Sequence, residues 1–235
     1  MTQGSRMDKV LASPEEAVAD IQDGSTIMFG GFGVAGIPFT LIKALYERGV
    51  KGITAITNSP GGRLEDFDLS VLFKKRQISK VVASYPVYAG KVNAFEELYQ
   101  KGGVELEVVP QGTFAERIRA GGAGIPGFYT PTGVGTVAEE GKEKRNFNGR
   151  EYLLELALKA DFALIKAHKA DRLGNLIYRM TARNFNPVMA TAAAITIAEV
   201  DEIIEVGGLD PESVVTPGIY VDRIIKGEKY DVGFK

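Results

Sequence analysis

The sequence predicts an α/β fold, built on an open, largely parallel sheet that is flanked by helices. Two observations lead to this expectation. Short apolar runs rich in β-branched residues, such as Ile53–Thr57, recur along the chain, and segments with helical periodicity, such as Phe39–Arg48, separate them. Strands that alternate with helices pair in parallel, because each helix carries the chain back to the same end of the sheet.

The first helix is expected to begin at Pro14. Ser13 is a preferred N-cap residue, proline suits the first helical position, and Glu16 stands where a capping box requires Glu or Gln. The Asp23-Gly24 pair then ends this helix, since glycine readily leaves the helical conformation.

A glycine-rich segment follows the first strand. Thr26–Phe29 is too short for a helix and starts with β-branched residues, which predicts a strand. Four glycines fall within the next seven residues. Phe39–Arg48 then places its apolar residues at helical spacing, and Gly49 is a suitable C-terminal stop. This order of strand, glycine loop and helix begins the alternation.

The later part of the chain repeats the pattern. Further strands are expected at residues 53–57, 81–84, 104–109, 162–165, 176–178 and 195–200, and a further helix at 94–101. The glycine-rich stretch 121–141 is expected to be a loop, in which glycine lets the main chain come close to a ligand.

Composition restricts the possible classes of function. The chain has 235 residues and no linker-like segment, so residues 8–235 are expected to form a single domain, and residues 1–7 a tag or disordered tail. A net charge of −2 gives no electrostatic reason for binding nucleic acid or a membrane surface. The absence of cysteine excludes disulfides and thiolate metal sites, and no apolar run approaches the ~20 residues of a membrane span. We therefore expect a cytoplasmic protein.

The glycine loop contains a formal dinucleotide-binding motif, formed by Gly31, Gly33 and Gly36. Its surroundings disfavour that function. The next strand ends in Asn58-Ser59 and lacks the carboxylate that would bind the ribose hydroxyls, and Pro38 removes an N–H at the helix start. A simple tight turn is the other interpretation, but it needs only one or two glycines. So many glycines favour the close approach of a ligand or of another main chain.

Five blocks of sequence resemble the α (A) subunit of class I coenzyme A transferases, in the 3-oxoacid CoA-transferase family. These blocks lie at residues 23–38, 110–124, 129–136, 182–187 and 216–220. The first includes Gly30-Gly31-Phe32 and Gly36-Ile37-Pro38. The resemblance covers nearly the whole chain from about Asp8.

The resemblance implies a shared active site. In this family the nucleophilic glutamate lies in a Ser-Glu-Asn-Gly motif of the β (B) subunit, and no Glu-Asn pair occurs in this chain. We therefore expect a partner β subunit, in an α2β2 assembly, and no activity from this chain alone. Coenzyme A would move from an acyl-CoA to a small carboxylate through a glutamyl-CoA thioester on the partner. Such chemistry needs neither a general base nor a metal, because the carboxylate is already ionised at pH 7 and a thiolate leaves readily. No resident cofactor is expected either, since coenzyme A is itself a substrate.

The resemblance also assigns site residues. Gln111 is expected to support the oxyanion of each thioester attack with its side-chain amide. The residues expected to contact coenzyme A or substrate are Gly30, Gly31, Phe32, Gly33, Val34, Ala35, Gly36, Ile37, Pro38, Asn58, Gly121, Gly122, Ala123 and Gly124. Succinyl-CoA with acetoacetate is the first choice of substrates, and 3-oxoadipate, acetate and butyrate stay open.

Several residues also have a purely structural interpretation. Gln111 could cap a loop, and Phe32 could pack in the core. His168 is more typical of a packed residue than of a base, and the segment 183–186 could fix loops rather than clamp a carboxylate. For the whole chain, a non-enzymatic α/β ligand-binding regulatory domain and a dinucleotide-dependent oxidoreductase are the alternatives. The first predicts tight ligand binding by this chain alone, and the second requires the missing ribose carboxylate.

Overall fold

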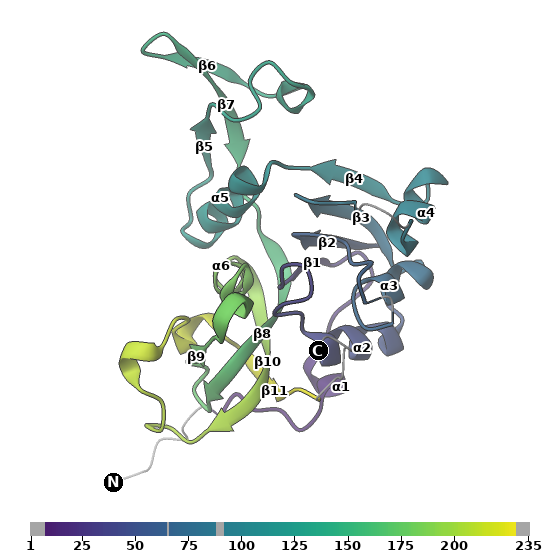
Figure 1. The fold of residues 1–235 in the computed structure, drawn as a ribbon. Coiled ribbons are helices and arrows are strands. Elements are labelled where there is room, and N and C mark those ends of the chain that lie inside the picture. Colours follow the sequence, from purple (N-terminus) through teal and green to yellow (C-terminus); the bar gives the residue numbers. More distant parts are fainter. Residues whose placement is uncertain (1–7, 65, 88–91, 229–235) are drawn as a thin grey trace.

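The computed structural model describes residues 8–64, 66–87 and 92–228 of the chain. The expected N-terminal tail at residues 1–7 lies outside these described residues. In the part that is described, eight strands form one sheet, of which seven are parallel and β9 pairs antiparallel with β8 (Figure 1). The order of the parallel strands is β11-β10-β8-β1-β2-β3-β4. The predicted α/β fold with an open, largely parallel sheet is therefore confirmed.

The elements of the large sheet follow one another from the N-terminus. Its strands are β1 (Thr26–Phe29), β2 (Ile53–Thr57), β3 (Ile78–Ala83), β4 (Glu105–Val108), β8 (Ala160–Asp171), β9 (Leu176–Ile177), β10 (Ala193–Ile204) and β11 (Arg223–Lys226). The helices are α1 (Pro14–Ala17), α2 (Phe39–Arg48), α3 (Ser70–Lys74), α4 (Ala94–Gln100), α5 (Gln111–Gly122) and α6 (Asn186–Ala190). Short 3₁₀ turns lie at Val137–Glu139, Met180–Arg183, Pro211–Ser213 and Gly218–Tyr220.

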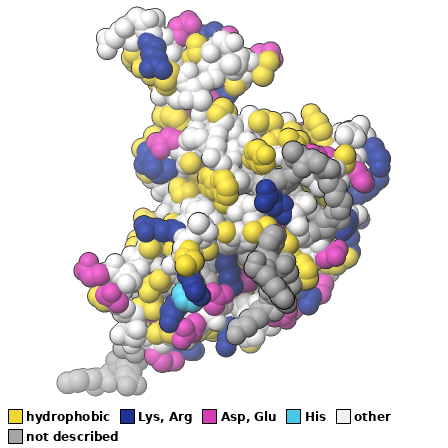
Figure 2. All heavy atoms as spheres, in the orientation of Figure 1, with side chains coloured by type: hydrophobic (Ala, Val, Ile, Leu, Met, Phe, Trp, Pro, Cys, Tyr) yellow, Lys and Arg dark blue, Asp and Glu magenta, His cyan; other side chains and the backbone are white. Residues whose placement is uncertain are grey.

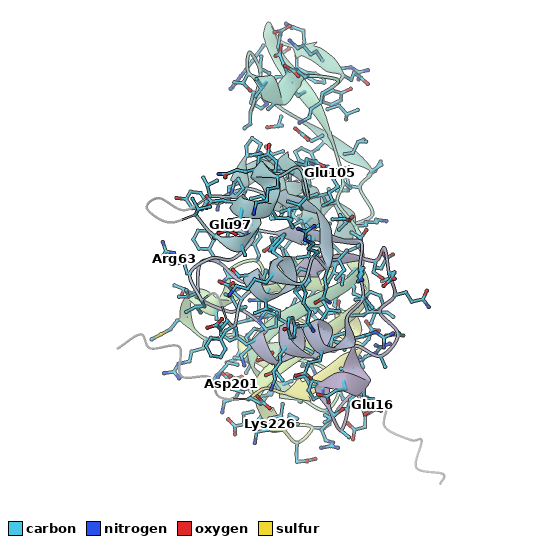
Figure 3. All side chains as sticks on the ribbon, turned by 90° about the vertical axis from the view of Figure 1, so that its right-hand side faces the viewer. Glu16, Arg63, Glu97, Glu105, Asp201 and Lys226 are labelled. Atoms are coloured by element: carbon cyan, nitrogen blue, oxygen red, sulfur yellow. The ribbon has the colours of Figure 1, made fainter. Side chains whose placement is uncertain are left out.

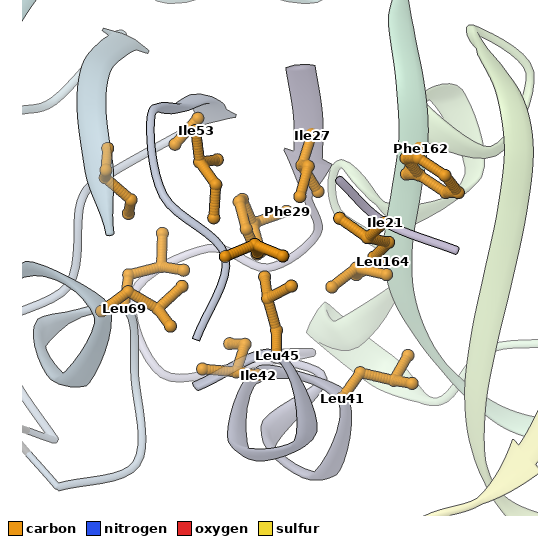
Figure 4. Packing of buried hydrophobic residues seen from close by; sticks show 14 of the residues in the cluster. Ile21, Ile27, Phe29, Leu41, Ile42, Leu45, Ile53, Leu69, Phe162 and Leu164 are labelled. Atoms are coloured by element: carbon orange, nitrogen blue, oxygen red, sulfur yellow. The ribbon is translucent and has the colours of Figure 1, made fainter. Parts of the chain in front are cut away.

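The sheet is covered on both faces by apolar cores. Residues of α1 to α4 pack on one face, and residues of α5 and α6 on the other. Alternate side chains of β1 belong to different cores: Ile27 and Phe29 face α2, where Ile42 and Leu45 lie against them (Figure 4), and Met28 faces the opposite side. Continuous apolar runs are expected in strands buried on both faces. This packing holds the carboxyl end of β1 in a fixed position.

A second, three-stranded antiparallel sheet projects from the body of the molecule. Its order is β5-β7-β6, with β5 (Gly127–Thr130), β6 (Lys144–Phe147) and β7 (Arg150–Leu156). Figure 2 shows only a narrow connection between this sheet and the body, and Figure 3 shows the same projection from the side, far from Asp201 and Lys226. All residues of β6 are exposed.

The expectation of a loop at 121–141 is therefore wrong in two places. Gly121 and Gly122 end helix α5, and residues 127–130 form strand β5. The reason is packing. A Cβ on Gly121 would lie 2.0 Å from the Leu158 carbonyl oxygen, and one on Gly122 would lie 2.1 Å from Thr191 Oγ1. These glycines let α5 approach its neighbours closely rather than leave the helix.

Other boundaries differ from the expectations in length. Helix α2 has the bounds predicted from the sequence, whereas α1 has only four residues. Ser13 caps α1 as expected, but the Glu16 carboxylate accepts a hydrogen bond from the Ala12 N–H, one residue before the position that a capping box requires. Strands β8 and β10 have twelve residues each and extend well beyond their predicted apolar centres.

Candidate functional site at the carboxyl edge of the sheet

The glycine loop lies at the point where the order of the sheet reverses. Strand β1 pairs with β2 on one side and with β8 on the other, and the following strands run outward in both directions. The Gly30 N–H donates a hydrogen bond of 2.9 Å to the carbonyl of Leu164 in β8. In open α/β sheets, ligands bind outside the carboxyl ends of the strands at such a reversal.

The loop folds back on itself in a tight turn. Phe32 and Ala35 exchange two main-chain hydrogen bonds of 3.0 and 3.1 Å, which places Gly33 and Val34 at the tip. Gly33 has a φ of +60° and Gly36 a φ of +71°, in the left-handed region that favours glycine. The Phe32 side chain is 48% exposed. Phe32 is therefore on the surface, and its interpretation as a core residue is wrong.

The tip of the loop offers main-chain donors. Within the described residues, the N–H groups of Gly33 and Val34 have no protein hydrogen-bond acceptor. On its inner side the loop closes against the segment after β2, around a cavity of about 20 Å³ that Gly31, Ser59 and Gly61 help to line. That volume suits about one water molecule. This space is too small for a larger ligand, which would approach the loop from its solvent side, where the exposed Phe32 lies.

The N-terminus of α2 is already satisfied by a protein carboxylate. Glu199 of β10, which is buried, accepts hydrogen bonds from the N–H groups of Thr40 and Leu41 at 2.8 and 3.2 Å. Lys166 Nζ lies 3.2 Å from its other oxygen. Burial raises the pKa of Glu199 although Lys166 and the helix N–H groups oppose that rise. A nucleotide pyrophosphate would need the same helix N-terminus, so this geometry argues against a dinucleotide site.

Two side-chain amides and one hydroxyl lie beside the loop, at the ends of the next three strands. Asn58 follows β2, Ser84 follows β3, and Gln111 begins α5 after β4. Asn58 is buried, and its Oδ1 accepts hydrogen bonds from Gln111 Nε2 at 2.9 Å and from Ser84 Oγ at 2.8 Å. The Gln111 side chain is exposed. Asn58 therefore fixes one N–H of the Gln111 amide and leaves the other available to a ligand.

The predicted site residues do not all meet. The loop at residues 30–38, Asn58 and Gln111 lie at the same edge of the sheet, as parallel strands require. Gly121, Gly122, Ala123 and Gly124 lie at the opposite end of α5 from Gln111, about 15 Å along the helix axis. Their predicted contact with coenzyme A stays a prediction.

The remaining candidates have structural partners. His168 Nδ1 lies 3.0 Å from Asp201 Oδ2 of the neighbouring strand, and the expectation that His168 is not a base stays a prediction. Asn184 and Asn186, in the segment considered as a carboxylate clamp, donate side-chain hydrogen bonds to the carbonyls of Ala35 and Gly36. This segment therefore fixes the glycine loop.

Two residues at this edge were missed from the sequence. Ser84 could have been found, because it is the last residue of a predicted strand, as Asn58 directly follows one. Glu199 could not, since it lies inside an apolar run and nothing in that run indicates that its carboxylate caps a distant helix.

Metal-binding and membrane-spanning features were also considered for the described residues. They hold no group of three or more His, Cys, Asp and Glu side chains suited to a metal ion. None of their helices has the length and apolarity to cross a bilayer.

Comparison with known proteins identifies the family. A family model described as coenzyme A transferase matches residues 11–227. The chain belongs to the coenzyme A transferase family. The family and the enzyme class expected from the resemblance are thereby confirmed, and neither the regulatory domain nor the oxidoreductase is supported.

Relatives extend this similarity over nearly the whole chain. The A subunit of a succinyl-CoA:3-ketoacid coenzyme A transferase of Helicobacter pylori J99 is 50% identical over 225 residues, 96% of this chain and 95% of that protein. The A subunit of a 3-oxoadipate CoA-transferase of Acinetobacter baylyi is 51% identical over 219 residues, 93% of this chain and 95% of that protein.

A solved structure agrees with the fold. An acyl-CoA transferase of Escherichia coli O157:H7, in a thioester complex with CoA, superposes with a TM-score of 0.81 at 23% identity. The match covers 94% of this chain and 47% of that longer chain. The transferase fold expected from the sequence is therefore present here.

Proposed function

We propose that this chain is the A subunit of a transferase that moves coenzyme A from succinyl-CoA to a 3-oxoacid such as acetoacetate. The observation that carries the proposal is the composition of the sheet edge. It combines free main-chain donors at Gly33 and Val34 with the oriented amide of Gln111. Donors of this kind stabilise developing negative charge, whereas the attacking group must come from elsewhere. The 50% identity to the Helicobacter pylori protein supports the choice of substrates.

The chemistry is a double displacement. A glutamate carboxylate of the partner attacks the thioester carbonyl carbon, and the coenzyme A thiolate leaves, giving a mixed anhydride. The thiolate then attacks the glutamyl carbonyl and releases the first carboxylate. The second carboxylate reverses these two steps and leaves as the new acyl-CoA. Each attack creates an oxyanion, and we assign its stabilisation in part to the free N–H of Gln111.

The glycine loop would bind coenzyme A in the same scheme. Its tip carries the unpaired N–H groups of Gly33 and Val34, which suit the carbonyl oxygens of the pantetheine arm. The exposed Phe32 ring offers an apolar surface for the methylene groups of that arm or for the partner subunit. The contacts with coenzyme A that are predicted for Gly30 to Pro38 would be made in this way.

The partner is proposed to be a B subunit. Both relatives are named as A subunits, which supports the expectation of a second kind of chain. The α2β2 stoichiometry and the cytoplasmic location stay predictions, which mass measurement of the purified complex and fractionation of the source cells would check.

A second candidate acceptor is 3-oxoadipate. The Acinetobacter baylyi relative is named for 3-oxoadipate and is 51% identical, close to the value for the succinyl-CoA:3-ketoacid relative. Both acceptors are 3-oxoacids, so the edge geometry serves either. They differ by the second carboxylate of 3-oxoadipate, which needs a cationic or amide partner.

The test is a transfer assay on the complex co-expressed with its B subunit. Succinyl-CoA is offered with acetoacetate, 3-oxoadipate, acetate or butyrate, and the acyl-CoA products are separated and quantified. We expect the highest kcat/KM with acetoacetate. A higher kcat/KM with 3-oxoadipate selects the second substrate, and the absence of any CoA transfer contradicts the proposed function.

A further inference from the structure

Asn186 lies where three separate segments meet the glycine loop. It is the first residue of α6 and is fully buried. Its Oδ1 accepts a hydrogen bond of 2.9 Å from the Lys166 N–H in β8. Its Nδ2 donates to the carbonyls of Gly36 and Ala182 at 3.0 and 2.9 Å. One side chain therefore joins the sheet, the segment before α6 and the far end of the loop.

Both ends of the glycine loop also lie very close to the Asn186 amide. A Cβ on Gly30 would lie 1.8 Å from Asn186 Oδ1, and a Cβ on Gly36 would lie 2.6 Å from Nδ2. No larger residue fits at Gly30 unless Asn186 moves, whereas at Gly36 the carbonyl oxygen of Ala182, 2.9 Å from such a Cβ, is a further obstacle. Asn186 thus requires glycine at position 30, and Asn186 and Ala182 together require it at position 36.

Only an asparagine meets these demands. Aspartate has the same shape, but its oxygens cannot donate to the carbonyls of Gly36 and Ala182, so acceptors would face each other in a buried place. Leucine would leave the Lys166 N–H and the two carbonyls without partners. Glutamine is one methylene longer and would collide with Gly30.

Asn184 makes a further hydrogen bond to the same part of the loop, next to Gly36. Its Nδ2 donates to the Ala35 carbonyl at 3.0 Å and to the Thr181 carbonyl at 2.7 Å. The carbonyls of residues 35 and 36 are thus both turned toward this segment. Their orientation fixes the peptide planes next to the tip, where the N–H groups of Gly33 and Val34 lie.

We propose that Asn186 is a positioning residue, whose amide sets the conformation of the glycine loop that binds the acyl-CoA. The proposal rests on the proposed function, because it concerns the same loop. Asn186 is fully buried, so we assign it no direct contact with the substrate. Its effect passes through Gly30 and Gly36, and a small displacement of bound groups from the reactive geometry is costly to the rate.

The first test compares variants of the complex with the B subunit. Asn186→Asp and Asn186→Ser are expected to lower kcat/KM for the acyl-CoA by about 100-fold, with a raised KM and with assembly retained. The matched control is Asn175→Ala, which removes a similar amide between Asp171 and the Gly218 N–H. This control is expected to lower Tm and to leave kcat/KM unchanged. Normal kcat/KM in Asn186→Asp overturns the proposal.

A double-mutant cycle tests the contact itself. Gly30→Ala alone is expected to be as harmful as Asn186→Ala, because its Cβ would lie 1.8 Å from Asn186 Oδ1 and 2.8 Å from Asn186 Cγ. Combined with Asn186→Ala, which removes both of these atoms, it is expected to add little. Effects on kcat/KM that multiply in the double variant contradict positioning through this contact.

Two further outcomes must be distinguished from the results above: Asn186 variants that do not fold, and a wild-type complex that is inactive. If the Asn186 variants do not fold, Asn184→Ala decides, because it removes one partly exposed amide. We expect it to lower kcat/KM about tenfold, and an unchanged value overturns the proposal. A wild-type complex that transfers no coenzyme A instead contradicts the proposed function, and this result is seen before any variant is made.

Discussion

The amide of Gln111 combines a structural bond with a free donor. One N–H is held at 2.9 Å by Asn58 Oδ1, which itself is fixed by Ser84. The loop-capping interpretation and the oxyanion interpretation of Gln111 are thus compatible, since the bond to Asn58 orients the second N–H. The sequence indicated Gln111 and Asn58 separately. Their contact depends on the pairing of β2, β3 and β4, which no local pattern encodes.

Replacement of Gln111 tests this arrangement. In the complex with the B subunit, Gln111→Ala is expected to lower kcat by about 100-fold with a small effect on KM, because the lost donor acts mainly in the transition state. Single-turnover and steady-state kinetics with succinyl-CoA measure the effect.

The matched control for Gln111 is another amide in this chain. Gln77 is buried before β3, at the amino end of the sheet, and donates to the carbonyls of Leu45 and Val50. Gln77→Ala is expected to lower Tm and to leave kcat unchanged. An unchanged kcat in Gln111→Ala would remove this residue from the mechanism.

Among the elements, the sequence predicted best those whose pattern is local. Helix α2 and strands β1 and β2 have the expected bounds, because their apolar residues are contiguous or helically spaced. The outer parts of β8 and β10 were missed because charged residues, Lys166 and Asp201, directly follow their apolar runs. These charges are tolerated because they pair with each other across the two strands.

The small projecting sheet was missed for a different reason. Strand β6 is exposed throughout, so it has no apolar face to give a period of two. Glycine content led to a wrong prediction of a loop at 121–141. Gly121 and Gly122 allow close packing of α5, whereas glycines at 30–36 shape a loop. Composition alone does not distinguish these two uses.

An ion pair between the segment after α1 and β11 gives stability that depends on pH. Arg223 donates two hydrogen bonds of 2.6 Å to the Asp20 carboxylate. These bonds lower the pKa of Asp20 in spite of partial burial. A carboxyl whose pKa is lowered in the folded state stabilises the fold above its unfolded pKa, and this contribution is lost as the pH falls through the folded pKa.

Asp20→Asn is therefore expected to lower Tm by about 1–3 °C near neutral pH, with a difference that closes below about pH 4. Thermal unfolding of both proteins over a pH series measures it. Asp66→Asn, at a carboxylate with an 85% exposed side chain, is the control and should change Tm little. A Tm difference that persists at acid pH would contradict the ionic origin of the effect.

For the molecule as a whole, the question is whether the projecting sheet unfolds together with the body. Chain continuity links β7 to β8, and α5 contacts both β5 and β7. We propose that residues 8–235 form a single domain, as the sequence predicts. Calorimetry is expected to show one unfolding transition with equal calorimetric and van't Hoff enthalpies. A separate transition that disappears when the projecting sheet is removed would contradict this.

The arrangement of the whole chain also implies where the covalent chemistry occurs. The described carboxyl edge presents Gln111, Asn58 and Ser84 beside the glycine loop, and we propose that these amides and this hydroxyl bind the substrate and stabilise its negative charge. The resemblance places the attacking glutamate on the B subunit. The two chains together would then form one active site.

The most direct measurement is chemical trapping of the intermediate. The complex is mixed with succinyl-CoA, reduced with borohydride or treated with hydroxylamine, and both chains are mapped by mass spectrometry. We expect one modified glutamate on the B subunit, no modification of this chain, and no coenzyme A transfer by this chain alone. A modified residue on this chain, or turnover without the B subunit, would contradict the proposed division of the active site.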